Sequence, residues 1–202
     1  MIFLVGPHAA GKTHCAEIIC QNNFVEIDLG PMLRNMHKES GAGGTFSEWM
    51  QKGEAEYGKQ FSDDLVVKGI ESIYETVLTK EHYPSDVVIV GSRSLQGIEY
   101  ILKEVPNYRD TKNTIIFMDA PFDTLFERYK QREKMDISKE EFYALLERDD
   151  ELGLNSLKPV ADYTITNDGD ENVLDREIKE LVLYKLHYPE LREIWEGKVK
   201  MR

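Results

Sequence analysis

A phosphate-binding loop follows the first apolar run of the chain. Residues 2–5 are apolar, and they lead directly into Gly6-Pro7-His8-Ala9-Ala10-Gly11-Lys12-Thr13, which fits the pattern G-x-x-x-x-G-K-T. Glycines let a backbone curve around phosphates without a Cβ in the way, and the loop N–H groups and the next helix N-terminus point at the anion. An apolar strand before the loop and a helical pattern after it predict nucleotide binding; a plain glycine turn is the alternative.

The loop assigns roles to individual residues. Lys12 is expected to reach the β- and γ-phosphates of ATP, and the Thr13 hydroxyl is expected to ligate Mg²⁺. For His8 the alternative is a loop residue without a ligand, and for His14 it is a structural place on the first helix. The predicted nucleotide-binding set of this segment is Gly6, His8, Ala9, Ala10, Gly11, Lys12, Thr13 and His14.

Composition limits the class of protein and its partners. The chain has 202 residues, a length that fits one domain over 1–202 with inserted flaps. Its net charge is −12, which disfavours nucleic acid as a partner. An acidic protein that holds a polyphosphate needs local basic side chains, so each arginine matters. No apolar run approaches the roughly 20 residues of a membrane span, and the first run is too short for a signal peptide. We expect the two cysteines, Cys15 and Cys20, to be reduced thiols and not a disulfide. We therefore expect a cytoplasmic protein, monomeric or homodimeric, without a membrane partner.

Alternating strand and helix patterns predict an α/β fold. The expected strands are continuous apolar runs, as in a parallel sheet that is covered on both faces; they lie at 2–5, 24–27, 87–90, 114–118 and 163–166. Capping boxes predict helix starts at Thr45 and Ser138, and Pro121 suits the first turn of another helix. The remaining expected helices cover 11–22, 31–38, 52–78, 94–104, 171–186 and 189–195.

Arginines stand where phosphates are expected. Arg34 and Arg93 follow the second and third predicted strands, and ligands bind beyond the carboxyl ends of strands in open α/β sheets. Arg128 and Arg132 are four residues apart on one helix face, so both can approach one anion. Arg148 begins Arg148-Asp149-Asp150. Solvated surface arginines and helix ion pairs are the alternative. Phosphoryl transfer depends on positioning and charge neutralisation, which this set favours.

The same segments resemble adenylate kinase-type nucleoside monophosphate kinases. Leu29-Gly30-Pro31-Met32-Leu33-Arg34 looks like the G-D-x-L-R segment of that family, and Gly91-Ser92-Arg93 is similar to its glycine–arginine turn. The resemblance implies that Arg34 and Arg93 hold the acceptor phosphate. Arg128-x3-Arg132 and the segment from Arg148 look like the lid and its flanking arginine, which close over the transition state.

The order of segments over about residues 1–180 is similar to a subgroup of adenylate kinase-like and dephospho-coenzyme A kinase-like proteins. It implies a P-loop three-layer sandwich with a five-stranded parallel sheet, an acceptor-binding flap at about 31–78 and a lid at about 128–148. The implied reaction moves the γ-phosphoryl group of ATP to a nucleotide-type acceptor, foremost a (deoxy)nucleoside monophosphate. The loop with Asn167 and Gly169 is implied to lie against the donor base, although a simple turn explains these residues too.

Two departures from the family keep other functions open. Val90 stands near the place of an aspartate that serves as a Walker-B-type Mg²⁺ ligand in the subgroup, and Pro31 replaces a common acidic residue. Asp28 is the best carboxylate to support Mg²⁺, and it lies near the base that dephospho-coenzyme A kinases use on a ribose hydroxyl; a helix N-cap is its alternative role. A dephospho-coenzyme A kinase-like enzyme and an ATP-binding regulatory protein with slow ATPase activity therefore remain alternatives.

Overall fold

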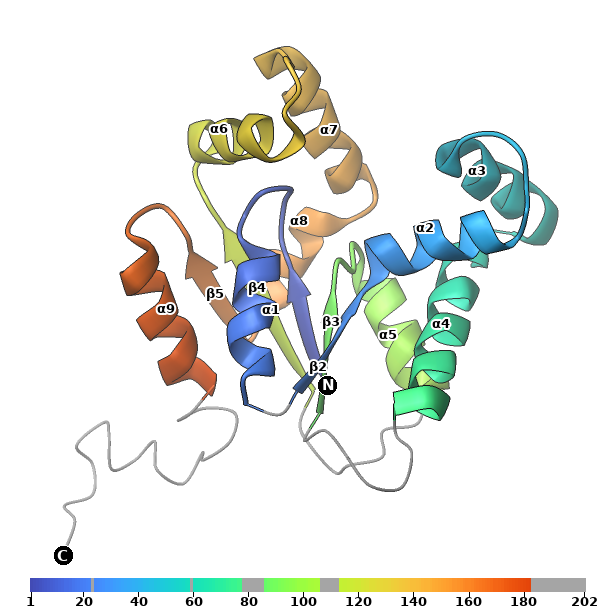
Figure 1. Ribbon diagram of the computed structural model, residues 1–202, viewed down its shortest axis with the longest axis horizontal. Coiled ribbons are helices and arrows are strands. Elements are labelled where there is room, and N and C mark those ends of the chain that lie inside the picture. The colour runs from blue at the N-terminus through green and yellow to red at the C-terminus, as the bar shows by residue number, and fades with distance from the viewer. Residues whose placement is uncertain (23, 59, 78–85, 106–112, 183–202) are drawn as a thin grey trace, which may run out of the picture.

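The computed structural model describes residues 1–22, 24–58, 60–77, 86–105 and 113–182 (Figure 1). The predicted helix at 189–195 and the end of the one predicted for 171–186 lie outside these ranges. None of the helices within them combines the length and the apolar character that crossing a membrane requires.

A five-stranded parallel sheet forms the centre of the protein. Its strands are β1 (Ile2–Val5), β2 (Phe24–Asp28), β3 (Asp86–Val90), β4 (Thr114–Asp119) and β5 (Tyr163–Thr166). They lie in the order β2-β3-β1-β4-β5, and every pair is parallel. The predicted fold class, an α/β sandwich with a five-stranded parallel sheet, is confirmed.

Strand periodicity divides the core into two clusters. Ile2 and Leu4 of β1 pack with residues of α1 and α9, whereas Phe3 and Val5 pack with residues of α4, α5 and α8. Successive side chains of a strand point to opposite faces, so a central strand that is buried on both faces has to be apolar throughout. All four residues of β1 are buried, which explains the continuous apolar run in the sequence.

Helices cover both faces of the sheet, with α1 and α9 on one side and α4 and α5 on the other (Figure 1). Their bounds are α1 (Lys12–Cys20), α2 (Leu29–Glu39), α3 (Phe46–Tyr57), α4 (Phe61–Val77), α5 (Leu95–Glu104), α6 (Phe122–Glu133), α7 (Lys139–Glu151), α8 (Leu154–Leu157), the 3₁₀ turn η1 (Lys158–Val160) and α9 (Glu171–Glu180). The capping boxes at Thr45 and Ser138 are both present and begin α3 and α7, as predicted.

The helix predicted for 52–78 is wrong as a single element. Gly58 adopts a φ of 95°, which ends α3 at Tyr57, and a separate helix α4 begins at Phe61. Because the Tyr57 and Phe61 rings stack with centroids 5.6 Å apart, the apolar stripe continues across the break and the pattern resembled one helix. The helix predicted for 31–38 starts earlier, at Leu29, because the Asp28 side chain caps it by accepting from the Gly30 N–H.

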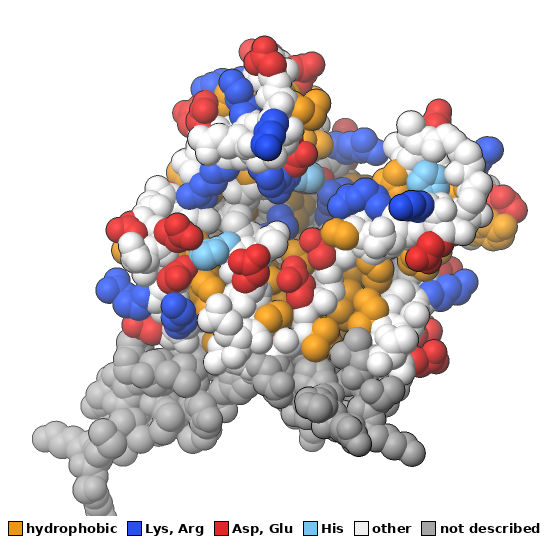
Figure 2. Space-filling model, in the orientation of Figure 1, with side chains coloured by type: hydrophobic (Ala, Val, Ile, Leu, Met, Phe, Trp, Pro, Cys, Tyr) orange, Lys and Arg blue, Asp and Glu red, His pale blue; other side chains and the backbone are white. Residues whose placement is uncertain are grey.

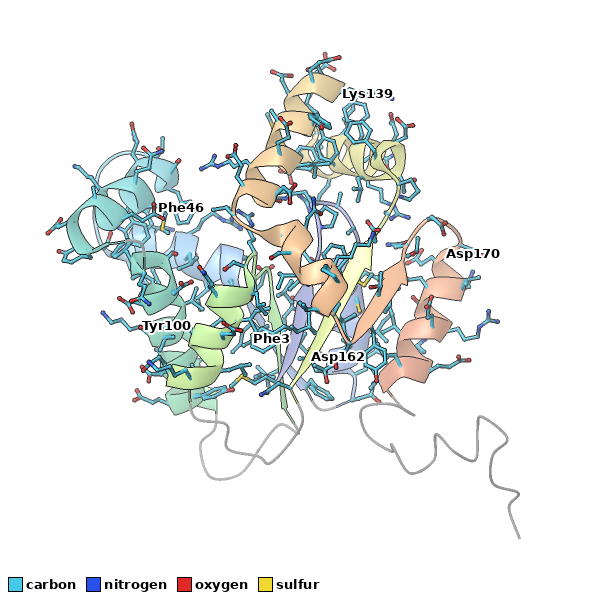
Figure 3. The ribbon with its side chains drawn as sticks, turned by 180° about the vertical axis from the view of Figure 1, so that it is seen from behind. Phe3, Phe46, Tyr100, Lys139, Asp162 and Asp170 are labelled. Atoms are coloured by element: carbon cyan, nitrogen blue, oxygen red, sulfur yellow. The ribbon has the colours of Figure 1, made fainter. Side chains whose placement is uncertain are left out.

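Two helical units stand on either side of the carboxyl edge of the sheet. The α2–α4 unit follows β2, and the α6–α7 unit follows β4 (Figure 1). Seen from behind, Phe46 lies at the start of α3 in the first unit and Lys139 near the top of the second (Figure 3). All five parallel strands end at the edge between these units, so the loops after them meet there.

Candidate functional site

A cavity of about 720 Å³ opens at the carboxyl edge of the sheet. It is walled by the loop after β1, the end of β2 with the first turns of α2, the end of β3 with the loop after it, and side chains of α6 and α7. The lining residues are Gly6, His8, Ala9, Gly11, Lys12, Thr13, Asp28, Gly30, Pro31, Arg34, Val90, Gly91, Ser92, Arg93, Arg128, Tyr129, Arg132, Glu133 and Asp149. Most of the residues that the sequence marked therefore share one space; Ala10, His14, Arg148, Asn167 and Gly169 are outside this lining.

The cavity is a basic region on an acidic protein. Its walls carry five basic side chains, Lys12, Arg34, Arg93, Arg128 and Arg132, against three acidic ones, Asp28, Glu133 and Asp149. Figure 2 shows basic side chains gathered around the hollow between the α6–α7 unit and α2. With a net charge of −12 over the whole chain, this local excess of positive charge marks the place where an anionic ligand is favoured.

The loop after β1 curves into an anion cradle because two of its positions exclude a side chain. Gly6 has a φ of 140°, and a Cβ on it would lie 2.1 Å from the Met118 carbonyl oxygen. Gly11 has a φ of 96°, and its Cβ would lie 2.4 Å from Nδ2 of Asn167. Ala9 also has a positive φ, 63°, which a residue with a Cβ rarely adopts. The backbone is thus held in a conformation that local preference alone does not favour, as in phosphate-binding loops.

Lys12 lies inside this cradle. Its Nζ donates hydrogen bonds to the carbonyl oxygens of Gly6, at 2.8 Å, and Pro7, at 2.7 Å. Burial lowers the pKa of Lys12 from 10.5 to about 8 because it disfavours the ammonium form, and the Asp149 carboxylate opposes this shift. The ammonium is therefore poorly solvated, and an incoming phosphate oxygen offers it a stronger partner than the two carbonyls do.

The cavity offers oxygen ligands that fit Mg²⁺. Thr13 and Asp28 both line it, and hydroxyl and carboxylate oxygens together with retained waters are what Mg²⁺ takes. Asp28 is a helix N-cap, because its Oδ1 accepts from the Gly30 N–H at 3.0 Å, and the residue also lines the cavity. Val90 contributes only an apolar wall, so a Walker-B-type carboxylate is missing there.

Ser92 adds a group that sequence reasoning missed. Ser92 is 7% exposed and lines the cavity. Its Oγ has no hydrogen-bond partner within the part of the chain that the structure describes. Its position immediately after Gly91, at the end of β3, was the available signal. A buried hydroxyl without a partner costs free energy unless a ligand or water satisfies it.

Arg34 enters the cavity from α2, the helix that follows β2, and Arg93 enters it from the loop after β3. The terminal nitrogens of Arg34 lie over Gly30, where a Cβ would meet them at 3.4 Å. Arg93 is 45% exposed at its side chain and directs its Nε at Asp149, 3.3 Å away. Because β2 and β3 are hydrogen-bonded neighbours, the segments that carry the two arginines follow adjacent strands of the sheet.

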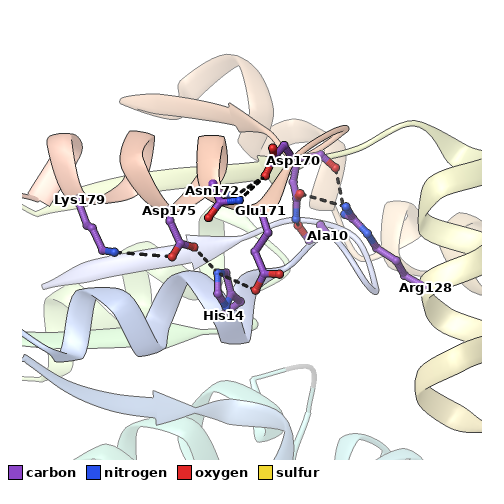
Figure 4. A network of polar contacts seen from close by, with 9 residues as sticks. Ala10, His14, Arg128, Asp170, Glu171, Asn172, Asp175 and Lys179 are labelled. Atoms are coloured by element: carbon purple, nitrogen blue, oxygen red, sulfur yellow. Dashed lines mark hydrogen bonds and ion pairs between the residues drawn. The ribbon is translucent and has the colours of Figure 1, made fainter.

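Arg128 and Arg132 have different partners in the structure. Arg128 donates from Nη1 to the Asn167 carbonyl oxygen at 2.9 Å and from Nη2 to Asn167 Oδ1 at 3.1 Å (Figure 4). Arg132 pairs through its Nε with Glu133 at 2.7 Å, and its guanidinium lies 5.4 Å from the centre of the Tyr129 ring. Both line the cavity, but Arg128 is engaged with the loop after β5, so the expected approach of both forks to one anion is not their arrangement here.

Arg148 lies outside the cavity lining, in contrast to the role expected for it. Its Nη2 is 3.5 Å from Oγ of Ser47 at the start of α3. This contact links the α6–α7 unit to the α2–α4 unit. The next residue, Asp149, has the buried place instead.

Asp149 is the functional candidate that sequence reasoning passed over. It is 3% exposed, its Oδ1 faces Arg93, and its Oδ2 lies 3.2 Å from His8 Nε2. Burial raises the pKa of the Asp149 carboxyl even though Arg93 and Lys12 lower it. The signal was available, because Asp149 falls seven residues after Phe142 on the buried face of an amphipathic helix, where an acidic residue needs a partner.

His8 belongs to the site, whereas His14 lies on the other side of the loop. Burial and the neighbouring Arg93 lower the pKa of His8 to about 4, so its ring is neutral near pH 7. His14 Nε2 bonds Asp175 Oδ1 at 2.6 Å and thereby joins α1 to α9 (Figure 4). His14 therefore has a structural contact between two helices, which was the alternative to nucleotide binding for this residue.

Asn167 is next to the loop without lining the cavity. Its Nδ2 donates to the Ala10 carbonyl oxygen at 3.0 Å, and the residue is 6% exposed. Gly169 is exposed, with nothing within 4 Å of the position of a Cβ. The buried amide of Asn167 thus supports the phosphate-binding loop from behind.

Comparison with known proteins finds a distant relative in sequence. No protein-family model matches the chain. A UPF0200/UPF0201 protein of Archaeoglobus fulgidus is 25% identical over 185 residues, which cover 91% of this chain and 55% of that protein. The chain thus spans about half the length of this curated relative.

Solved structures share the fold at low sequence identity. TT1252 from Thermus thermophilus has a TM-score of 0.59 and 16% identity, with 91% of this chain and 96% of that chain covered. Shikimate kinase from Acinetobacter baumannii has a TM-score of 0.51 and 18% identity, with 98% and 94% covered. A gluconokinase from Sinorhizobium meliloti has the same TM-score and identity, with 98% and 97% covered. The protein therefore shares the fold of these structures, a five-stranded parallel sheet covered by helices.

Proposed function

We propose that this protein transfers the γ-phosphoryl group of ATP to a small nucleotide-type acceptor, foremost a (deoxy)nucleoside monophosphate. The observation that carries the proposal is that Lys12 shares one cavity of about 720 Å³ with Arg34, on the helix after β2, and Arg93, in the loop after β3. One cation for the donor and two for an acceptor in a single space suit phosphoryl transfer, in which positioning and charge neutralisation supply most of the catalysis.

The donor side rests on the phosphate-binding loop. The cradle formed around Gly6 and Gly11 would hold the β- and γ-phosphates, and Lys12 would give up its carbonyl partners to stabilise charge on the transferring group. Thr13 and Asp28 would hold Mg²⁺, which neutralises phosphate charge when it is bound. Asn167 and Gly169 would lie towards the donor base.

The acceptor side rests on the arginines and the two helical units. Arg34 and Arg93 would hold the acceptor phosphate, an oxygen of which forms a bond to the γ-phosphorus as the bond to the leaving ADP breaks. In this proposal the α2–α4 unit, near 31–78, is the acceptor flap, and the segment near 128–148 is the lid that excludes water. Arg132 would add charge from the lid side, and Arg128 would fix the loop at Asn167.

A hydroxyl acceptor is the second candidate, and Asp28 favours it. A hydroxyl needs a base to take its proton, whereas a phosphate is already anionic. Asp28 places a carboxyl in the wall of the same cavity as Lys12. The matched structures named shikimate kinase and gluconokinase support the same possibility, as does the alternative of a dephospho-coenzyme A kinase-like enzyme.

An acceptor panel tests the proposal. The protein is incubated with Mg-ATP and each of AMP, CMP, UMP, GMP, their deoxy forms, dephospho-coenzyme A, shikimate and gluconate, and the products are resolved by mass. Conversion of a monophosphate far faster than ATP is hydrolysed would establish the first candidate, and conversion of a hydroxyl acceptor would establish the second. Slow ADP release with every acceptor would contradict both and favour a regulatory ATP-binding protein.

Three variants sharpen the result. Lys12→Ala should abolish turnover while the fold is retained, and unchanged turnover would contradict the assignment. Arg34→Glu should weaken acceptor binding but not ATP binding; Lys38→Glu, at an exposed position of the same helix, is the matched control. Asp28→Asn should abolish transfer to a hydroxyl, whereas transfer to a phosphate should fall much less.

A further inference from the structure

One carboxylate holds two cavity groups that come from separate loops. Asp149 projects from α7, with its side chain 5% exposed. Its Oδ1 is 3.3 Å from Arg93 Nε, in the loop after β3, and its Oδ2 is 3.2 Å from His8 Nε2, in the phosphate-binding loop. Each oxygen of the carboxylate therefore orients a different group.

The contact with Arg93 leaves the arginine able to bind an anion. A guanidinium has five N–H donors, and Asp149 takes the one on Nε. The N–H groups of the two terminal nitrogens remain for a ligand, and 45% of the Arg93 side chain is exposed. One of these nitrogens, Nη2, lies 3.5 Å from His8 Nε2 in the phosphate-binding loop. A carboxylate on the Nε edge thus fixes the plane of the guanidinium and leaves its other edge for a phosphate.

His8 completes the arrangement. With Asp149 Oδ2 at 3.2 Å, the ring donates from Nε2, which turns the P-loop side chain towards α7. The ring also meets Tyr129 of α6 edge-on, with centroids 6.0 Å apart. Both helices of the α6–α7 unit consequently contact one residue of the phosphate-binding loop.

We propose that Asp149 is a positioning residue that orients Arg93 and His8 for phosphate binding and makes this orientation depend on the place of the α6–α7 unit. The inference rests on the proposed function in one respect, that the phosphate belongs to an acceptor. When α7 is in place, the Arg93 fork is fixed before the ligand arrives, and less conformational freedom is lost on binding. When α7 moves away, Arg93 and His8 lose their common partner.

A purely structural ion pair would behave differently. Replacing one partner of a buried pair destabilises a protein whatever the pair does for ligands. Such a pair would change the unfolding transition and leave phosphate affinity unaltered in the folded fraction. Phosphate affinity measured on folded protein therefore separates the two roles.

The experiment measures binding of inorganic phosphate and of AMP to Asp149→Asn by isothermal titration calorimetry. Asparagine keeps the shape and removes the charge, and charge-assisted hydrogen bonds are about twice as strong as neutral ones. We expect binding weakened on the order of 10- to 100-fold. Glu147→Gln, which removes the same charge from an exposed position of α7, should bind as the wild type does. Unaltered affinity in Asp149→Asn, or no phosphate binding by the wild-type protein, would overturn the inference.

A double-mutant cycle tests whether the effect acts through Arg93. In the Arg93→Ala background, Asp149→Asn should weaken phosphate binding little further, whereas independent losses that multiply would overturn the inference. If Asp149→Asn does not fold, Asp149→Glu replaces it: the longer side chain displaces the carboxylate, so affinity should fall only while Arg93 is present. Equal affinity losses from Asp149→Glu with and without Arg93 would contradict the inference.

Failure of the proposed function is recognisable separately. If no acceptor is phosphorylated in the panel, the transfer reaction is refuted, while the phosphate titrations still decide the role of Asp149. If an acceptor is found, Asp149→Asn should raise the acceptor KM on the order of 10-fold or more and change kcat less.

Discussion

The side-chain amide of Asn167 donates a hydrogen bond to the carbonyl oxygen of Ala10, 3.0 Å away. The two residues are 157 positions apart in the chain, and their contact supports the phosphate-binding loop from the loop after β5. The same amide group accepts from Arg128 through Oδ1. Asn167 therefore connects the loop, the end of the sheet and α6 through one buried side chain.

We expect Asn167→Ala to destabilise the protein by about 1–3 kcal/mol, because the Ala10 carbonyl and the Arg128 guanidinium each lose a partner. Urea unfolding gives the free energy, and ATP titration should show weaker binding. Asp168→Ala, at the exposed neighbouring position, is the control and should stay within about 0.5 kcal/mol. Equal stability of the two variants would contradict a bracing role for Asn167.

The sequence predicted the sheet well because each strand is an uninterrupted apolar run. All five strands lie within one residue of their expected bounds, and the two capping boxes marked α3 and α7 correctly. The same reasoning failed at Gly58, because a single glycine inside an apolar stripe does not by itself distinguish a helix end from a tolerated helix glycine. Tertiary contacts decide between the two.

The site could be predicted only in part, because spacing along the chain places residues near an edge but does not choose their partners. The lining position of Arg34 and Arg93 could be predicted because both lie in segments that follow the carboxyl end of a strand. The partner of Arg128 is Asn167, 39 residues further along, and no local pattern indicates that pair. Arg148 and Asp149 are adjacent on a helix, where neighbours point in different directions, so the buried residue can be identified only once the packed face of α7 is known.

Gly6 and Gly43 offer a matched pair of glycine substitutions. Gly6→Ala places a Cβ 2.1 Å from the Met118 carbonyl oxygen and at a φ of 140°, and the strand that carries this oxygen cannot give way easily. We expect a loss of about 2 kcal/mol or more and loss of ATP binding. Nothing lies within 4 Å of a Cβ on Gly43, so Gly43→Ala should alter neither quantity measurably. Tight ATP binding by Gly6→Ala would show that the loop tolerates another conformation.

The two cysteines should resist thiol reagents in the folded protein. Burial raises the pKa of Cys15 from 9.0 to about 12, and burial with the Glu26 carboxylate raises that of Cys20 to about 11. The thiolate is the reacting form, so labelling with a disulfide reagent at pH 8 should be slow for the native protein and fast in urea. Cys20, which is the more exposed, should react first. Fast native labelling of a Cys20→Ser variant would show that Cys15 is accessible.

The same shifts give a pH dependence of stability. Both thiols have a folded pKa above that of the unfolded chain, so the unfolded chain loses its protons first as the pH rises. Their contribution is complete below about pH 9 and is lost as the pH rises towards 11 and 12. Urea midpoints at pH 8 and pH 10 should therefore differ more in the wild type than in a Cys15→Ala, Cys20→Ala variant. If the midpoint changes equally between the two pH values in both proteins, the pH dependence does not come from the two thiols.

Arg148 should matter less for turnover than Arg132. Arg132 lines the cavity, whereas the Arg148 side chain contacts Ser47 Oγ at 3.5 Å, between two exposed segments. Exposed polar contacts of this length contribute little, so Arg148→Ala should alter the free energy of unfolding by less than about 0.5 kcal/mol. Steady-state kinetics with the identified acceptor should give a kcat for Arg148→Ala within about tenfold of the wild type, and a lower one for Arg132→Ala.

Ser47→Ala is the partner variant for this comparison. If the contact between the two helical units assists closure, Ser47→Ala and Arg148→Ala should raise the acceptor KM alike, and the double variant should add nothing further. A fall in turnover for Arg148→Ala as deep as that for Lys12→Ala, with no effect of Ser47→Ala, would mean something else. It would require α7 to swing inward during catalysis and bring Arg148 onto the transferring phosphoryl group, as the resemblance to the lid of adenylate kinase-type enzymes implies.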